Sequence, residues 1–436
     1  MDDAFEQARA LFLEGMSLFG QGDYDNAALR LEASLRHLPG RASTLLNLGV
    51  TRLRLGQPQA ALQALDAALA AQPDMADAWG HRGVALAELS RLDEALAAFD
   101  EALARAPGTP AASYHRAVAL GVLGRHGDAL AAFNAMLQSQ PDDARTWLQQ
   151  ARMLQCVNRH DEALPSYRRA LALDPTLGDG WSLLGQLLKD RGQMNEAADC
   201  FEQALTHGAD AELNRWLLAG VRGGMAPEHA PASYVQQLFD GYAAEFDRHL
   251  RGGLRYRAPE ELAALLAKAD IPRGRAALDL GCGTGLCATL LRRHADAVDG
   301  VDLSGAMLEQ ARVQGLYRRL FKADAVAHLQ ATTERYALVL AADVFIYIGA
   351  LDAVFASVRR VLEPGGHFAF SVEAAAADVR FELRPSLRYA HGEAYLRDLA
   401  QRHGLSWLAQ HEAPLREDQG RPVAGLYLVL GTPGAP

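Results

Sequence analysis

A short glycine-rich run, Asp279-Leu280-Gly281-Cys282-Gly283-Thr284-Gly285, is the part of the sequence best suited to binding chemistry. It ends an apolar stretch that predicts a buried strand, and a helical pattern follows it. In open α/β sheets, ligands bind beyond the carboxyl ends of the strands, and glycines there let the backbone turn sharply and approach the ligand closely. The run therefore predicts a site for a nucleotide-like ligand.

Two further acidic residues end the next two predicted strands. Asp302 is placed to accept hydrogen bonds from two ribose hydroxyls, and Asp324 is placed to accept one from an adenine amino group. Met307 follows Asp302 near the start of a helix. It either covers one face of the adenine or packs in the core, and both interpretations stay open.

An α/β sheet is needed to bring these residues together. Strands are expected over 276–282, 297–303, 320–325, 336–344 and 367–373, with helical patterns between them, which predicts a parallel sheet covered on both faces. Two further strands, 406–412 and 425–431, have no helix of useful length between them and predict an antiparallel hairpin at one edge. The expected sheet has seven strands.

The glycine loop, the three acids and the turn Arg359-Arg360-Val361-Leu362-Glu363-Pro364-Gly365-Gly366 together resemble the class I S-adenosylmethionine-dependent methyltransferases. The resemblance implies a Rossmann-like α/β domain with S-adenosylmethionine as cofactor and S-adenosylhomocysteine as product. Nicotinamide dehydrogenases share the first loop and the ribose carboxylate, but not this loop spacing or the proline-glycine turn. The cofactor-binding residues expected here are Asp279, Gly281, Cys282, Gly283, Gly285, Asp302, Leu303, Met307, Asp324, Ala325 and Asp343.

Segments 234–259, 388–391 and 415–425 resemble a bacterial group of predicted methyltransferases that also carry helical repeats. This resemblance implies that helices before the first strand cover the sulfonium. Tyr242, Tyr256 and Arg257 are then expected at the methionine end of the cofactor, where Arg257 pairs with the carboxylate. Tyr389 and His391 are expected to line an acceptor pocket, with His391 as general base or, alternatively, as an ordinary structural histidine.

Asp343, which follows the fourth predicted strand, completes the expected catalytic set of His391, Tyr389 and Asp343. The run after this strand, Asp343-Val344-Phe345-Ile346-Tyr347, lacks the Asn/Asp-Pro-Pro-Tyr pattern typical of adenine and glutamine N-methyltransferases. Nucleobase or glutamine methylation is therefore not expected. The four cysteines form no CxxC pair, and we expect no metal site.

The first half of the chain is a repeat array. Prolines recur every 34 residues, and alanines and aromatic or leucine residues keep the same step. The repeating positions are Pro39, Pro73, Pro107, Pro141 and Pro175, then Ala27, Ala61, Ala95, Ala129, Ala163 and Ala197, then Leu31, Leu65, Phe99, Phe133, Tyr167 and Phe201. These residues resemble the tetratricopeptide repeat family. Six helix pairs starting near residues 8, 42, 76, 110, 144 and 178, with a terminal helix over 211–221, are expected.

The expected architecture is multidomain: an all-α repeat solenoid over 1–222, a Gly- and Pro-containing linker over 223–233, and the methyltransferase domain with its N-terminal cap helices over 234–436. A net charge of −10 argues against a nucleic-acid partner. No apolar run suits a membrane span and the start of the chain is acidic, so a cytoplasmic protein without membrane association is expected.

The function expected is methyl transfer in which the repeat groove recruits a protein or peptide substrate. One alternative is a small-molecule methyltransferase whose repeats dock a partner enzyme or mediate homo-oligomer formation. A second is a non-catalytic adaptor whose enzyme domain has decayed, although the intact loop, Asp302 and Asp324 argue against it.

Overall fold

The computed structural model describes residues 2–243, 246, 255–269, 271–418 and 420–434 of the 436-residue chain. The chain divides into two compact units, Met1–Gly180 and Trp181–Pro436. Among the described residues, none of the helices combines the length and the apolar character needed to cross a membrane.

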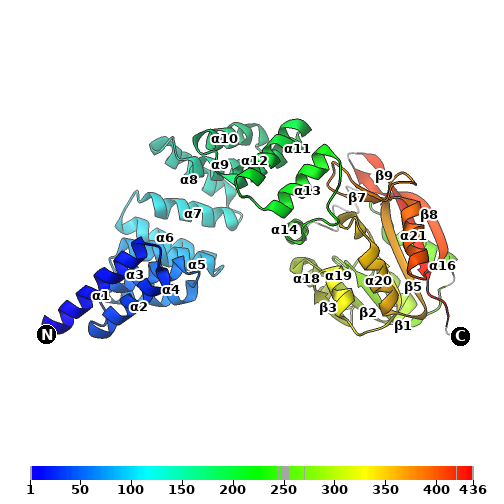
Figure 1. Ribbon diagram of the computed structural model, residues 1–436, viewed down its shortest axis with the longest axis horizontal. Helices are drawn as coiled ribbons and strands as arrows, with labels where there is room; N and C mark the ends of the chain where they lie inside the picture. The colour runs from blue at the N-terminus through cyan, green and yellow to red at the C-terminus, as the bar shows by residue number, and fades with distance from the viewer. Residues whose placement is uncertain (1, 244–245, 247–254, 270, 419, 435–436) are drawn as a thin grey trace. The chain divides into compact units, whose positions relative to one another are not determined.

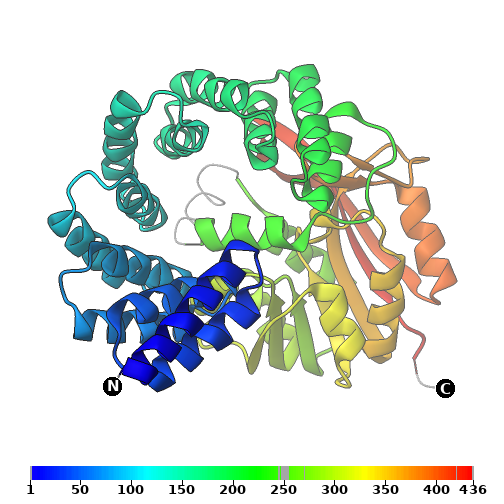
Figure 2. The ribbon, with the colours of Figure 1, turned by 60° about the vertical axis from the view of Figure 1, so that its left-hand side comes forward.

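The first unit consists of antiparallel helix pairs that follow one another side by side (Figure 1, and from another angle in Figure 2). From the second pair to the fifth, the first helices begin at residues 42, 76, 110 and 144, which confirms the predicted period of 34. The helices are α1 (Asp2–Gly20), α2 (Tyr24–His37), α3 (Ala42–Arg54), α4 (Pro58–Ala71), α5 (Ala76–Glu88), α6 (Leu92–Arg105), α7 (Pro110–Val122), α8 (His126–Ser139), α9 (Ala144–Cys156) and α10 (His160–Leu173).

The repeating small and large residues pack as the sequence predicts. Ala95 is fully buried in α6, and the ring of Phe99, one turn later, is also buried. A Cβ atom on Gly83 of α5 would lie only 2.5 Å from Cε1 of Phe99, so glycine is what allows the two helices of this pair to approach. The alternation of small and large side chains thus sets the helix spacing within a repeat.

The second unit begins with the last helix pair of the repeat pattern and two further helices. They are α11 (Gly178–Asp190), whose first residues precede the boundary between units, α12 (Met194–Thr206), α13 (Ala211–Arg222) and α14 (Ala232–Tyr242). α11 and α12 form the sixth pair, and α13 matches the predicted terminal helix. Asp210 begins α13, because its side chain accepts a hydrogen bond from the Leu213 amide.

A twisted sheet follows, with strand order β3-β2-β1-β4-β5 and parallel pairing throughout this part. β9 pairs antiparallel with both β5 and β8, which confirms the predicted hairpin at one edge. The strands are β1 (Gly274–Leu280), β2 (Ala295–Asp302), β3 (Arg319–Lys322), β4 (Tyr336–Ala341), β5 (Leu362–Ala374), β6 (Phe381–Leu383), β7 (Tyr389–His391), β8 (Ser406–Asp418) and β9 (Arg421–Gly431).

All seven predicted strands form, and the described residues add two short ones, β6 and β7, which pair with each other beside the end of β5. Helices cover both faces of the sheet, as expected for parallel strands. One face carries α16 (Ala258–Lys268) and α17 (Ala288–His294). The other carries α19 (Ala325–Ala331), α20 (Asp352–Val361) and α21 (Glu393–Arg402); α18 (Gly305–Val313) connects β2 and β3, and the short helix η1 (Phe345–Tyr347) follows β4.

Candidate functional site

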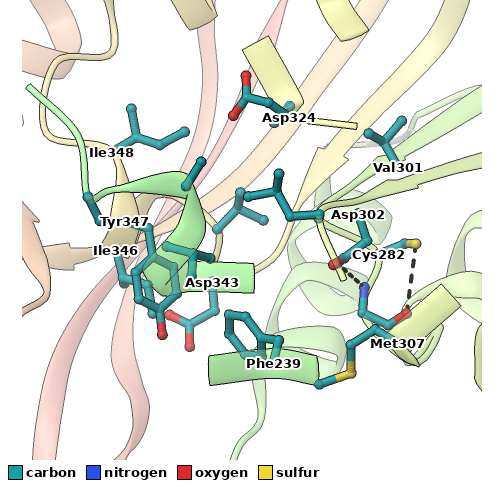
Figure 3. A pocket seen from close by; sticks show the side chains of 18 of the residues that line it. Phe239, Cys282, Val301, Asp302, Met307, Asp324, Asp343, Ile346, Tyr347 and Ile348 are labelled. Carbon is teal, nitrogen blue, oxygen red and sulfur yellow. Dashed lines mark hydrogen bonds between the residues drawn. The ribbon is translucent and has the colours of Figure 1, made fainter. Parts of the chain in front are cut away.

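The carboxyl ends of β1, β2 and β4 open into a cavity of about 1060 Å³ in the second unit (Figure 3). Most of the predicted cofactor residues line it. These are Asp279, Gly281, Cys282, Gly283, Asp302, Leu303, Met307, Asp324, Ala325, Asp343 and Tyr256. The sheet therefore brings together side chains that lie up to 87 positions apart in the sequence, from Tyr256 to Asp343.

The glycine loop follows β1 in a conformation that favours glycine. Gly281, Gly283 and Gly285 all have positive φ angles, of 67°, 53° and 94°. A Cβ atom on Gly281 would lie 2.5 Å from Cγ2 of Val344, so this residue also lets the loop pass close to the end of β4. Gly285 lies outside the cavity lining and serves the turn itself, because Ala288 N donates a hydrogen bond to its carbonyl.

The Asp302 carboxylate holds this loop against the end of β2. Its Oδ2 accepts a hydrogen bond from Gly283 N, and its Oδ1 accepts one from Ser304 N, each at 2.8 Å. Burial raises the pKa of the Asp302 carboxyl, and the two amide hydrogen bonds act in the opposite direction. Each oxygen keeps acceptor capacity beyond its one amide bond, since an ionised carboxylate offers about four lone-pair sites.

Asp279 at the end of β1 is 2% exposed. The hydroxyl of Tyr317 donates a hydrogen bond to its Oδ2 at 2.6 Å. Burial raises the pKa of Asp279 to about 7, in spite of this hydrogen bond, and the nearby Asp302 adds to the rise. The carboxyl is therefore only partly ionised near neutral pH.

α14 covers the end of the cavity near Asp302. Oδ1 of Asp240 accepts a hydrogen bond from the Ser304 hydroxyl at 2.5 Å, which ties α14 to the start of α18. Phe239 of the same helix lines the cavity near Met307 (Figure 3). Its ring meets that of Tyr347 edge-on, with 5.7 Å between the two ring centroids. Met307 is both 1% exposed and part of the lining, so it packs in the core and also faces the cavity.

The other end of the cavity holds a buried ion-pair cluster that the sequence did not reveal. Asp343 adopts a φ of 59° and receives two hydrogen bonds from Nη1 of Arg416, at 2.7 and 2.9 Å. Nη2 of Arg416 bonds to Glu373, whose second oxygen lies 3.2 Å from Nη1 of Arg384. Burial raises the pKa of Glu373, and Arg416 opposes this rise. The cluster balances two carboxylates with two guanidiniums, and it fixes Asp343 at the cavity wall.

Arg416 reaches this cluster because the β8–β9 pairing shifts register between Pro414 and Arg416. Leu415 and Arg416 are consecutive, yet they are 0% and 2% exposed. In a regular strand, neighbouring side chains point to opposite faces, so the shift changes the face of the sheet to which Arg416 points. One signal was present in the sequence: Glu373 is an acid at the end of an apolar predicted strand, and such a residue needs a partner.

Three predicted residues are placed differently, and the side chain of a fourth is not described. Arg257 is 68% exposed at its side chain, pairs with Glu261 at 3.2 Å and does not line the cavity, so it is not positioned to hold a cofactor carboxylate. The side chain of Tyr242, at the end of α14, lies outside the described residues. Tyr389 and His391 are 0% and 1% exposed and do not line the cavity. The expectation that they line an acceptor pocket is therefore corrected.

His391 is also unsuited to act as a base. Its Nε2 lies 2.9 Å from the carbonyl oxygen of Ile348 and 3.1 Å from that of Gly349, and burial lowers its pKa to about 4. The cavity lining includes a different histidine, His229, from the segment predicted to be a linker. Glu228 and Ala230 of that segment, together with Arg388 and Tyr347, are further lining residues that sequence reasoning missed.

The two cysteines near the glycine loop, Cys282 and Cys287, are poorly suited to covalent catalysis. Burial raises the pKa values of the Cys282 and Cys287 thiols, so both are neutral and weakly nucleophilic. Within the part of the chain that the structure describes, no cluster of His, Cys, Asp and Glu side chains could hold a metal ion.

Comparison with known proteins assigns both parts of the chain. A family model described as a methyltransferase domain matches residues 277–366. A tetratricopeptide repeat model matches residues 12–57, 46–110, 91–144, 114–178 and 148–212.

Among curated relatives, malonyl-(acyl-carrier protein) O-methyltransferase of Geobacter sulfurreducens is 35% identical over 143 residues, which are 32% of this chain and 52% of the relative. Human methyltransferase-like protein 27 is 38% identical over 24% of this chain and 44% of its own length. A ubiquinone biosynthesis O-methyltransferase of Vibrio cholerae is 30% identical over 26% of this chain and 48% of its own length. The chain thus spans about half the length of the curated relatives that it matches.

Among solved structures, a tetratricopeptide repeat protein of Parabacteroides merdae aligns with a TM-score of 0.43 at 20% identity, covering 57% of this chain and 94% of that protein.

The methyltransferase family model covers the glycine loop, Asp302 and Asp324, and the repeat model covers the repeat helices from residue 12 to residue 212. The chain therefore carries tetratricopeptide repeats over residues 12–212 and a class I methyltransferase domain that includes residues 277–366.

Proposed function

We propose that the protein transfers a methyl group from S-adenosylmethionine, bound in the cavity of the second unit, to an acceptor recruited by the repeat array. The observation that carries this proposal is the charge of the cavity lining. Acidic residues outnumber basic ones there: Glu228, Asp302, Asp324 and Asp343, together with the partly protonated Asp279, stand against Arg388 and Arg416. An acidic cavity favours a sulfonium and an ammonium group and disfavours the pyrophosphate of a dinucleotide.

The nucleoside fits the Asp302 end of the cavity. Because each oxygen of this carboxylate keeps acceptor capacity beyond its amide hydrogen bond, two ribose hydroxyls can each donate to one oxygen. Met307 would then cover the adenine, and Asp324 would lie at its amino edge. The Asp324 carboxylate already accepts a hydrogen bond from Ala327 N at 2.9 Å, which leaves its other oxygen for that contact.

The methionine end would extend along Gly281 and Gly283 toward Asp343. Bound there, the cofactor supplies an electrophilic methyl group. The chain's own residues would hold the acceptor in line with it and exclude water, with Tyr347 and Tyr256 on the cavity wall. Burial raises the pKa of Tyr347 to about 12, so its hydroxyl keeps its proton at neutral pH and can donate a hydrogen bond to an acceptor oxygen.

A protein or peptide acceptor, held by the repeats, is the form of this function that we favour, because tetratricopeptide repeats make up nearly half of the chain. A small-molecule acceptor is the second candidate. It is supported by the relatives, whose names describe a malonyl-(acyl-carrier protein) O-methyltransferase and an O-methyltransferase of ubiquinone biosynthesis.

Titration with S-adenosylhomocysteine in a calorimeter tests the cofactor site. Asp302→Ala should weaken binding by about 1–3 kcal/mol, because charge-assisted hydrogen bonds to ribose are lost. Asp296→Ala is the matched control, since Asp296 lies on the same strand, is 68% exposed at its side chain and pairs with Arg273. Equal affinity of the two variants would contradict the assignment of Asp302.

The acceptor class is tested by incubating the full-length protein with methyl-labelled S-adenosylmethionine and cell lysate. Label in the protein fraction supports recruitment of a protein or peptide, and label in the low-mass fraction supports the second candidate. Label in neither fraction, with cofactor bound, would favour a non-catalytic adaptor.

A further inference from the structure

One wall of the cavity is formed by residues 347–350, here called the wall segment, which includes Tyr347 and Ile348. It is irregular and needs partners for its backbone groups. The amides of Gly349 and Ala350 donate hydrogen bonds to the Glu228 carbonyl at 2.8 and 2.9 Å, and Ala230 N donates to the Tyr347 carbonyl at 2.9 Å. The wall segment is thus paired with residues 227–230, here called the connecting segment, which lie between α13 and α14.

Two buried side chains of β7 bind the backbone of the connecting segment and of the wall segment. The hydroxyl of Tyr389 donates a hydrogen bond to the Pro227 carbonyl at 2.8 Å. Nε2 of His391 faces the carbonyl oxygens of Ile348 and Gly349, so this nitrogen must carry the hydrogen and act as the donor to both. Since burial lowers the pKa of His391 to about 4, the ring keeps this neutral form near pH 7.

The turn between β6 and β7 in turn contacts α13, the helix that follows the sixth repeat. A Cβ atom on Gly220 would lie 2.5 Å from Cδ2 of Leu387, so the helix backbone approaches the turn directly. Trp216, on the same helix, is fully buried, and its ring lies 4.6 Å from that of Tyr234 at the start of α14. Packed contacts therefore run without a break from α13 through β7 and the connecting segment to the wall segment.

We propose that Tyr389 and His391 are positioning residues for the wall segment, and that the position of α13 and ligand binding in the cavity are thermodynamically coupled. The affinity of the cavity for its ligand then depends on contacts that reach as far as α13, the helix after the sixth repeat. Coupling of this kind is reciprocal, so a ligand in the cavity should change the surroundings of α13, and a shift of α13 should change ligand affinity. The ligand side of this proposal rests on the proposed function.

The first test uses S-adenosylhomocysteine as the probe and Trp216 as a reporter in the otherwise unchanged full-length protein. Fluorescence emission is recorded with and without saturating probe, which gives the change that the probe causes. The change measured in the same way for Trp216→Phe is then subtracted, and the remainder is the contribution of Trp216. We expect a probe-dependent change in this contribution, because Trp216 lies in α13 and does not line the cavity.

The second test measures probe affinity in variants of the contact chain. His391→Phe should weaken binding at least fivefold, and His391→Gln, which restores an N–H donor, should stay within twofold of the unchanged protein; the lower end of typical coupling between sites is about fivefold. Gly220→Val should also weaken binding at least fivefold. Gly127→Val is its matched control, since a Cβ atom there meets nothing within 4 Å.

The outcomes separate the two proposals. If calorimetry detects no binding of the probe to the unchanged protein, the proposed function fails. If the probe binds but the Trp216 emission does not respond, and His391→Phe and Gly220→Val keep full affinity, the coupling is overturned while the proposed function stands.

Discussion

Asp279 shows at the scale of one residue how the fold changes the chemistry of a side chain. In the unfolded chain, an aspartate ionises near pH 3.9. In the folded protein, burial raises the pKa of Asp279 to about 7, so between these values the native state holds a proton that the unfolded state releases. The free energy of unfolding should therefore fall as the pH rises from about 4 to 7, and the loss should be complete above pH 7.

Asp279→Asn removes this dependence while keeping an oxygen that can accept the hydrogen bond from Tyr317. Relative to the variant, the ligand-free protein should lose up to about 1.4 kcal/mol of unfolding free energy per pH unit in this window. Urea denaturation of both proteins at several pH values between 5 and 8 measures the difference. Parallel stability curves would show that Asp279 titrates normally.

Individual site residues differ in how far the sequence could predict them. Asp302 and Asp324 were predicted because strand ends gather at one edge of a parallel sheet, and both line the cavity. Arg416 was not predicted, and Tyr389 and His391 were expected in a pocket that they do not line, because the surroundings of all three depend on strand pairing between distant segments. A histidine near a predicted pocket does not reveal that two backbone carbonyls already occupy its ring nitrogen.

At the scale of elements, the repeats were the most predictable part. The 34-residue step predicted where the second to the sixth helix pairs begin, because it depends only on local proline, alanine and aromatic positions, whereas α1 begins at Asp2 and not near residue 8. The seven main strands followed from apolar runs bounded by turns. β6 and β7 were missed because three residues are too few to show a periodic pattern.

The close approach of helices within a pair should make the repeat glycines intolerant of larger side chains. Gly83→Val forces a side chain against the buried ring of Phe99, and we expect a loss of about 1–3 kcal/mol in unfolding free energy from overpacking. Gly127→Val controls for helix propensity, because no atom lies within 4 Å of its added Cβ. Urea denaturation followed by circular dichroism compares the two; equal losses would argue against the packing explanation.

At the scale of the whole molecule, the two compact units meet in the chain at Gly180 and Trp181, so that α12 and α13 belong with the methyltransferase domain. The repeat pattern alone runs past this point to residue 212. A pattern of repeating residues identifies the helix pairs, but it does not predict whether the last pair packs more closely with the other repeats or with the following domain. A domain boundary after residue 222 remains a prediction.

Truncation distinguishes these boundaries. A chain that begins at Trp181 should keep its affinity for S-adenosylhomocysteine within about threefold, because α13 and its contacts with Leu387 and Tyr234 remain. A chain that begins at Gly223 exposes the buried surface under Trp216 and should bind more weakly or aggregate. Calorimetry and gel filtration of both chains test this, and equal behaviour would place the boundary after α13.

The register shift at Leu415 gives the edge hairpin a meaning beyond closing the sheet. Along a strand, odd and even positions face opposite sides, and one additional residue exchanges the two sets for everything that follows. Arg416 comes directly after that exchange, and its guanidinium is shared by Asp343 and Glu373. Whether Arg416 can neutralise Asp343 and Glu373 therefore depends on whether an odd or an even number of residues precedes it in β8. The number of residues in the edge strand matters to the charge of the cavity wall as much as the identity of the charged residues.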